Sequence, residues 1–255
     1  IDECAKVLDL DSCSGVFVTR ALCENIFLMA LHVYMGLPLF LVGEAGSSKS
    51  ISLALLASRT RAALDALDSA SGQHRGQRTG MVALLRRTTP FILQCSSQLS
   101  AAMLQREFER ASVLARGGEV ALESLVVVLE EVGLSYRKGG PVPTLKVLHS
   151  LLDAKCALDR DRESRVAFIA LSNTFLDAAK MNRGTVAQRS KADHSDVQRI
   201  IEQTLSRGLA LHLQPAPAMP SDVVHKLKSI LQELYRKVSD VRDGAKVQWR
   251  PRLFG

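Results

Sequence analysis

The segment from Leu39 to Leu67 constrains the fold more than any other part of the chain. Leu39 to Val42 is a short, wholly apolar run of the kind that forms a buried parallel strand. The next eight residues, from Gly43 to Ser50, read GEAGSSKS, and the stretch from Ser50 to Leu67 has the pattern of a helix. A buried strand, a loop ending in Lys-Ser and a helix, in that order, predict a phosphate-binding (Walker A) loop.

Each part of this loop has an expected role. Backbone N–H groups of the loop and of the helix N-terminus would point at phosphate oxygens. Lys49 would place its ammonium on the β- and γ-phosphates, and the Ser50 hydroxyl would coordinate Mg²⁺. The nucleotide-binding residues predicted from the sequence are Gly43, Glu44, Ala45, Gly46, Ser47, Ser48, Lys49 and Ser50.

One residue departs from the general pattern. The pattern has Gly immediately before the lysine, whereas this chain has Ser48. A Cβ atom at that position costs little if φ is negative, and ~1–2 kcal/mol if the residue is left-handed. Gly43 and Gly46 stay at the positions where the loop most needs glycine.

An acidic pair follows the strongest strand of the sequence, Leu125 to Leu129, which is uncharged and rich in valine. This arrangement predicts a Walker B element ending in Glu130 and Glu131. The first acid of such a pair is usually Asp and holds the magnesium shell, and the second orients the attacking water. Glu130 carries one more methylene than Asp, and we expect its carboxylate still to reach a magnesium-bound water. We therefore expect Ser50 and Glu130 at the metal and Glu131 as general base.

A polar strand end is the third element of the predicted site. The apolar run Val166–Leu171 is followed by Ser172 and Asn173. This pattern resembles AAA+ ATPases, where the strand between the Walker A and Walker B strands ends in a polar sensor of the γ-phosphate. Asn173 fits that place, although Asn after a strand also forms ordinary turns.

Arginines further along are candidates for a finger that acts on a neighbouring module. Arg183, or Arg189 nearby, would stabilise transition-state charge on the γ-phosphate. An arginine exposed at a helix end explains Arg183 equally well. The predicted catalytic residues are thus Glu131, Asn173 and Arg183.

The rest of the chain predicts the fold class. Strands alternating with helices favour an α/β fold, a three-layer P-loop architecture with helices on both faces of a parallel sheet. The further predicted strands are Phe91–Cys95 and Leu209–Leu213, and the further helices are Thr19–Met35, Ala101–Ala115, Thr144–Leu152 and Ser221–Val241.

We expect three regions along the chain. Residues 1–37 form an N-terminal helical lead-in, and residues 38–214 form the core. The core carries a basic, glycine-containing loop insertion over residues 69–89. Residues 215–255 form a linker and the start of an incomplete helical lid.

Composition excludes several classes of protein. The net charge of +7 favours phosphate-bearing partners, but only 5% of residues are aromatic and no aromatics interleave with the arginines, so we expect no nucleic-acid partner. The apolar stretch Ile26–Val42 is broken by His32, Gly36 and Pro38, which argues against a membrane span. Five cysteines without zinc spacing suggest reduced thiols. The chain opens without Met or a signal peptide, and we expect an excised segment of a cytoplasmic protein.

Four segments together resemble the AAA+ modules of the mysterin family, giant RING-type E3 ubiquitin ligases with a dynein-like core. They are Ala21–Asn25 leading to Pro38–Gly43, then Gly46–Ser50, then Val127–Leu134, and Ser172–Asn173 with Leu176–Asp177 and Lys180–Gly184. The family also lacks Gly at the position of Ser48. Glu130 and the 69–89 insertion depart from the family.

The resemblance implies a module that binds ATP with Mg²⁺ and lies in a ring of similar modules of the same or an adjacent chain. Ubiquitin transfer would belong to other parts of the parent protein. Two functions stay open, an ATP-hydrolysing motor module and a non-hydrolysing structural module. A GTPase is disfavoured because neither Asn-Lys-x-Asp nor Asp-x-x-Gly occurs.

Overall fold

The computed structural model describes residues 2–13, 16–70, 80–96, 98–117, 123–133, 146–158, 166–176, 181–189 and 196–204, with isolated positions between 222 and 233. The chain divides into two compact units, Ile1–Lys191 and Ala192–Gly255. The first unit holds the sheet, and the site described below lies within it. Among the described residues, no helix has the length and apolar character that crossing a bilayer requires.

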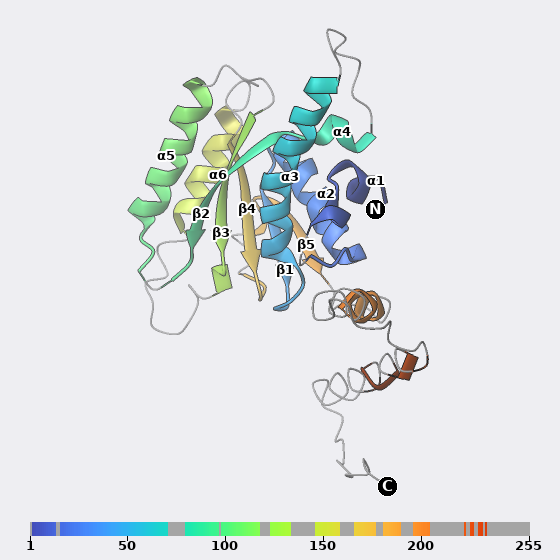
Figure 1. Cartoon of the computed structure of the whole chain (residues 1–255). Helices are drawn as coiled ribbons and strands as arrows, with labels where there is room; N and C mark the ends of the chain where they lie inside the picture. Colours follow the sequence, from blue (N-terminus) through green and yellow to red (C-terminus); the bar gives the residue numbers. More distant parts are fainter. Residues whose placement is uncertain are drawn as a thin grey trace, which may run out of the picture. The chain divides into compact units, whose positions relative to one another are not determined.

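Five parallel strands form one sheet in the order β2-β3-β4-β1-β5, and their carboxyl ends lie at one edge (Figure 1). The strands are β1 Leu39–Gly43, β2 Arg87–Gln94, β3 Glu123–Glu130, β4 Val166–Ser172 and β5 Thr185–Arg189. β4 lies between β1 and β3, as expected for the strand that carries the polar end. The predicted parallel α/β sheet is confirmed.

Helices cover both faces of this sheet. They are α1 Asp2–Val7, the 3₁₀ helix η1 Leu10–Ser12, α2 Arg20–Met35, α3 Lys49–Ala70, α4 Gly80–Leu84, α5 Ala101–Gly117 and α6 Val147–Leu158. Alternate residues of each strand face opposite layers, so Leu39 and Leu41 pack with helices α1 to α4 whereas Phe40 packs with α5 and α6. The apolar strands are therefore buried on both sides.

Helix α2 begins and ends where the sequence predicts. The Thr19 side chain accepts a hydrogen bond from Leu22 N at 3.2 Å and caps the N-terminus. Gly36, with φ of 70°, ends the helix in the left-handed conformation. Its buried stripe includes Leu22, Ile26 and Met29, and it also includes two polar residues, Asn25 and His32.

The layer under α5 and α6 is built around Phe168. This ring lies 5.7 Å from the ring of Phe40 in an edge-on arrangement and 5.8 Å from the ring of Phe108 in a stacked one. All three side chains belong to the same buried cluster. Aromatic contacts of this geometry add to the stabilisation that burial alone supplies.

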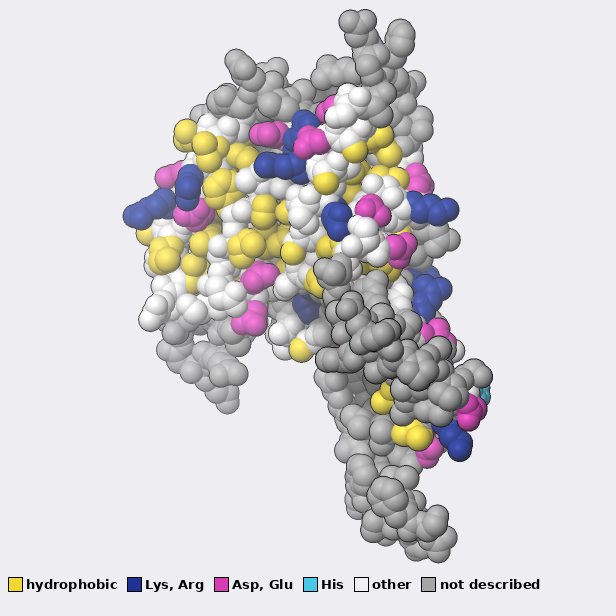
Figure 2. Space-filling view, in the orientation of Figure 1, with side chains coloured by type: hydrophobic (Ala, Val, Ile, Leu, Met, Phe, Trp, Pro, Cys, Tyr) yellow, Lys and Arg dark blue, Asp and Glu magenta, His cyan; other side chains and the backbone are white. Residues whose placement is uncertain are grey.

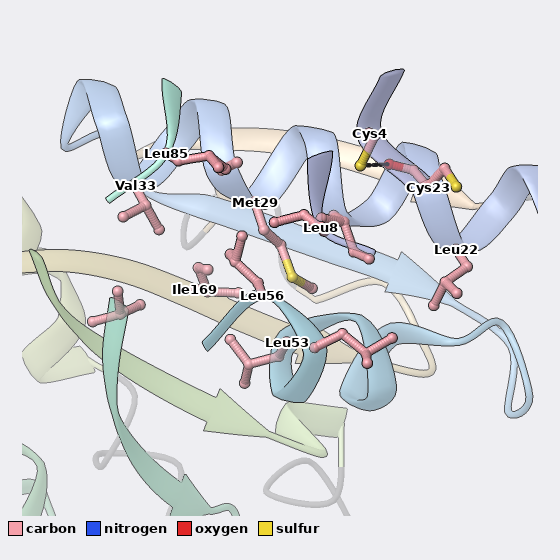
Figure 3. Close-up of a cluster of buried hydrophobic side chains, with 14 of the residues drawn as sticks. Cys4, Leu8, Leu22, Cys23, Met29, Val33, Leu53, Leu56, Leu85 and Ile169 are labelled. Atoms are coloured by element: carbon pink, nitrogen blue, oxygen red, sulfur yellow. Dashed lines mark hydrogen bonds between the residues drawn. The ribbon is translucent and has the colours of Figure 1, made fainter. Parts of the chain in front are cut away.

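Residues before the first strand are part of the core. Cys4, Leu8 and Leu10 are buried in the same cluster as Leu39 and Ile169. Figure 3 shows the side chains of Cys4, Leu8 and Ile169 in this cluster. The helical segment expected over 1–37 thus closes one face of the sheet.

Part of the stretch predicted as a loop insertion is regular structure. Helix α3 runs to Ala70, α4 starts at Gly80 and β2 starts at Arg87, while residues 71–79 lie outside the described part of the chain. Arg87 bonds Asp65 at 2.6 Å and Asp68 at 3.1 Å, which ties the start of β2 to the end of α3.

The fifth strand of the sheet differs from the predicted one. β5 is formed by Thr185–Arg189, whereas the predicted Leu209–Leu213 strand lies outside the described residues. The described positions within the predicted Ser221–Val241 helix are helical.

Candidate phosphate-binding site

The predicted phosphate loop lies at the carboxyl edge of the sheet, between β1 and α3. Gly43, the last residue of β1, is paired with Arg189 on one side, and Val42 is paired with Ser172 on the other. The loop turns through a hydrogen bond from Ser47 N to Glu44 O at 3.2 Å. Helix α3 then starts at Lys49, so its N-terminal amides face the end of the central strands.

Lys49 is buried inside the loop. Its Nζ donates to Gly43 O at 2.6 Å, to Glu44 O at 2.8 Å and to Ser47 Oγ at 3.0 Å. Only 8% of the residue is exposed, and burial lowers the pKa of its ammonium. Anionic phosphate oxygens would favour the charged form and would replace these neutral acceptors.

Two loop residues have left-handed backbone. Gly46 has a φ of 83° and Ser48 a φ of 59°. Of the two conformations considered for position 48 in the sequence, Ser48 thus has the strained, left-handed one, which costs ~1–2 kcal/mol. Ser48 O in turn accepts from Ser52 N at 2.9 Å and from Ser52 Oγ at 2.6 Å, which holds the residue at the start of α3.

Helix α2 contacts the loop from behind. Asn25 is fully buried, and its Nδ2 donates to Ser47 O at 2.9 Å. The neighbouring Glu24 binds Arg20 at 2.7 Å and also binds Arg189. Hydrogen bonds from Arg20 and then Arg189 lower the pKa of the Glu24 carboxyl.

The two arginines proposed as fingers lie in different places. Arg189 is bound to Glu24 within its own module, and its side chain is 15% exposed, so it would have to leave this ion pair to act on a neighbouring module. Arg183 is half-buried and precedes β5. Because Thr185 N donates to Pro38 O at 2.9 Å, Arg183 lies near the amino edge of the sheet, away from its own phosphate loop. Any action on a γ-phosphate would therefore be on another module.

The acidic pair lies where β3 ends. Glu130 is the half-buried last residue of β3 and its carbonyl accepts from Cys95 N at 2.9 Å. Glu131 is exposed and left-handed, with a φ of 53°. The residues beyond it turn back toward β4, because a Cβ atom at Gly133 would lie 2.7 Å from Thr174 Oγ1.

Asn173 lies in the turn after β4. Ser172 Oγ donates to Thr174 O at 2.5 Å and accepts from Thr174 N at 3.2 Å, so the strand end is locked in a tight turn. Asn173 itself is exposed. The structure thus gathers the phosphate loop, the acidic pair and Asn173 at one edge of the sheet, and leaves Arg183 near the other.

The residues present fit a nucleoside triphosphate. The loop combines a buried lysine, a helix N-terminus and two left-handed residues that turn successive amides, which is the arrangement that cradles anions. No group of three or more His, Cys, Asp or Glu residues suited to a metal occurs in the described part of the chain. Ser50 and Glu130 remain the residues that would hold a magnesium ion, together with phosphate and water oxygens.

Sequence reasoning found the loop but not its support from α2. Asn25 entered only as part of a family-like motif, and Glu24 had no assigned role. One signal was available: Asn25 lies between Leu22 and Met29 on the apolar stripe, and a buried amide must find a hydrogen-bond partner.

Comparisons with known proteins identify the family to which this chain belongs. A family model described as "RNF213 AAA domain" matches residues 15–196. The chain is 32% identical over 203 residues to mouse E3 ubiquitin-protein ligase RNF213 and 32% identical over 216 residues to zebrafish (Danio rerio) E3 ubiquitin-protein ligase rnf213-beta. These matches cover 77% and 84% of this chain but only 4% of each relative.

A solved structure, that of C. elegans PCH-2, superposes with a TM-score of 0.54 at 14% identity, covering 89% of this chain and 61% of that one. At this identity the likeness concerns the fold alone. The motifs, the sheet order and the family match together confirm the resemblance to mysterin. The chain belongs to the RNF213 (mysterin) family and is an AAA+ module of it.

Proposed function

We propose that this module binds ATP with Mg²⁺ and hydrolyses it, and that it couples nucleotide state to the conformation of a ring of AAA+ modules in an RNF213-like E3 ubiquitin ligase. One observation carries the proposal. The buried Lys49 ammonium is held by three acceptors of its own loop, at the edge of the sheet where Glu130, Glu131 and Asn173 also lie.

Each residue then has a chemical task. Loop amides and Lys49 bind the phosphates and offset their charge. Ser50 and Glu130 would hold the metal, which would supply positive charge near the phosphate oxygens. Glu131 accepts a proton from the attacking water, and Asn173 keeps that water in line. Arg183 acts on the γ-phosphate of a neighbouring module.

Contact with neighbouring modules has support from the surface. The large exposed apolar residues of the outer strand β2 and of α5 are Ile92, Met103, Val113 and Leu114. Figure 2 shows hydrophobic side chains over the part of the face that β2 and α5 occupy in Figure 1. Apolar surface of this kind marks sites of protein contact. Ubiquitin transfer and a cytoplasmic location are proposed for the parent protein as a whole.

A second function is a module that binds ATP without hydrolysing it and stiffens the ring. Two observations favour it. Glu130 replaces the usual Asp, and Glu131 is exposed with strained backbone, so its carboxylate is not held by a buried environment.

Binding is tested by calorimetry with ATP and Mg²⁺. Wild type should bind and Lys49→Ala should lose most of the affinity. Equal heats for the two proteins would remove the proposal that this loop binds nucleotide.

Hydrolysis needs the complete ring protein, because a finger comes from a neighbour. Phosphate release should fall at least about 100-fold when Glu131→Gln is introduced, as expected for loss of a general base. Bound ATP should be retained. If phosphate release attributable to this module is unchanged, the non-hydrolysing function is the correct one.

A further inference from the structure

We infer that Asn25 is a positioning residue of the phosphate loop. Its side-chain amide holds the Ser47–Ser48 peptide so that the Ser48 N–H faces the phosphate. The inference rests on the proposed binding of ATP, and it assigns to α2 a part in that binding.

The contact itself is well defined. Asn25 Nδ2 donates to Ser47 O at 2.9 Å, across 22 positions of sequence. The side chain has no exposed surface, and its helix neighbours Leu22 and Ile26 are 1% and 0% exposed. Packing of this density fixes the rotamer, so the amide donor has a fixed position behind the loop.

The side-chain oxygen of Asn25, Oδ1, indicates why an asparagine occupies this position. Asn25 Oδ1 is buried and makes no hydrogen bond within the described residues. A buried amide that leaves its oxygen unpaired is costly for folding. An apolar residue of similar size would suit the buried stripe better, so the contact with Ser47 is the feature that an asparagine supplies here.

Peptide geometry links this contact to the anion site. A trans peptide is planar, and its C=O and N–H point in opposite directions. Holding Ser47 O toward α2 therefore turns Ser48 N–H away from α2. A phosphate loop binds anions only while its N–H groups face the ligand and its carbonyls face away.

The strained backbone of Ser48 favours a second conformation of the loop, in which the Ser47–Ser48 peptide is flipped. Turning the Ser47–Ser48 peptide over would change the φ of Ser48 from 59° by about half a turn, to roughly −120°, a region that any residue adopts. The flipped loop would relieve the strain at Ser48 but would present Ser47 O to the phosphate. The Asn25 amide opposes this flip. A glycine at position 48 would tolerate both orientations and would need the amide less.

The test is a double-mutant cycle in the full 255-residue chain, with ATP and Mg²⁺ as the calorimetric probe. Asn25→Leu keeps the branching and the number of heavy atoms of the side chain and removes the donor. We expect it to raise the Kd about fivefold by lowering the population of the competent loop. In a Ser48→Gly background the same change should raise the Kd less than about twofold. The thermal midpoint without nucleotide should stay at or above that of wild type.

A matched control separates this role from general loss of a buried polar group. Thr60 is fully buried on α3 and bonds Leu56 O at 2.6 Å, and neither residue belongs to the loop. Thr60→Val should leave the Kd unchanged. If Asn25→Leu does not fold, Asn25→Ala is measured in both backgrounds instead.

The outcomes are distinguishable. Absence of ATP binding by wild type would defeat the proposed function before the cycle begins. Binding by wild type with an unchanged Kd for the Asn25 variant would overturn the positioning role alone. An equal loss in the wild-type and Ser48→Gly backgrounds would overturn the peptide-flip explanation.

Discussion

Replacing Gly43 by alanine tests the close approach of β1 and β5 at the base of the phosphate loop. The added methyl group would lie 2.8 Å from Arg189 Cβ and 2.9 Å from Ser47 Oγ. Arg189 Cβ cannot swing aside, because Gly43 and Arg189 are paired across the sheet. The two strands must therefore separate or the loop must shift. Overpacking of this kind costs ~1–3 kcal/mol, and we expect about 2 kcal/mol.

Urea unfolding measures this cost. For a unit of this size the free energy of unfolding falls by roughly 2 kcal/mol per molar urea, so the midpoint should fall by about 1 M. Calorimetry with ATP and Mg²⁺ should show weaker binding in the same variant, because the shift occurs where the loop leaves β1.

Gly46→Ala is the matched control within the same loop. No heavy atom lies within 4 Å of the added Cβ, but the φ of 83° strains any residue other than glycine. The expected cost is ~1 kcal/mol, about half that of Gly43→Ala. The reasoning fails if both variants shift the midpoint equally, or if Gly43→Ala leaves stability and binding as they are in wild type.

Three further predictions concern Lys49, Glu24 and Phe168. Burial lowers the pKa of the Lys49 ammonium, and phosphate favours the charged form of this group. The ATP affinity measured by calorimetry should therefore fall as pH rises through the lowered pKa. Lys49→Met should remove this pH dependence. The pKa of the Glu24 carboxyl is lowered by Arg20 and Arg189. Its contribution to stability is therefore present above the pKa of the unfolded chain and is lost as pH falls through the pKa of the folded protein. The urea midpoints of wild type and Glu24→Gln should differ at neutral pH and converge in acid. Phe168→Ala should cost ~3–5 kcal/mol in urea unfolding, whereas Phe27→Ala, at a site 43% exposed, should cost under ~1 kcal/mol.

Divergent midpoints of wild type and Glu24→Gln in acid would contradict the ion-pair assignment, and equal losses at Phe168 and Phe27 would contradict the described core. A flat pH profile for wild-type binding would mean that Lys49 does not titrate at the site.

Three of the predicted strands are buried on both faces, and a fourth, predicted over Phe91–Cys95, overlaps the edge strand β2. β1, β3 and β4 contain continuous apolar runs, which is the pattern expected of strands covered on both faces. β5 reads TVAQR and lies at the edge of the sheet, where its residues are mostly exposed or half-buried. Its pairing with β1 is a tertiary contact, and neither periodicity nor composition carries that information.

The site divides in the same way. The order of strand, loop and helix predicted the loop that the structure has between β1 and α3, because that pattern is local in sequence. The left-handed φ of Ser48 could not be predicted from the residue type, because serine usually has a negative φ. The partners of Asn25 and Arg189 lie 22 and 165 positions away, and such pairs emerge only when the fold brings them together.

The location of α1 and α2 in the core has a practical consequence for anyone who expresses or sequences this module. A version trimmed to begin just ahead of β1 would uncover Leu39, Leu41 and Ile169 and would also remove Asn25. Such a truncation should aggregate, and it should also lose the nucleotide binding proposed above. Substitutions at the buried residues Leu8 or Leu22 should lower the amount of folded module, and so should reduce nucleotide binding although neither residue belongs to the phosphate loop.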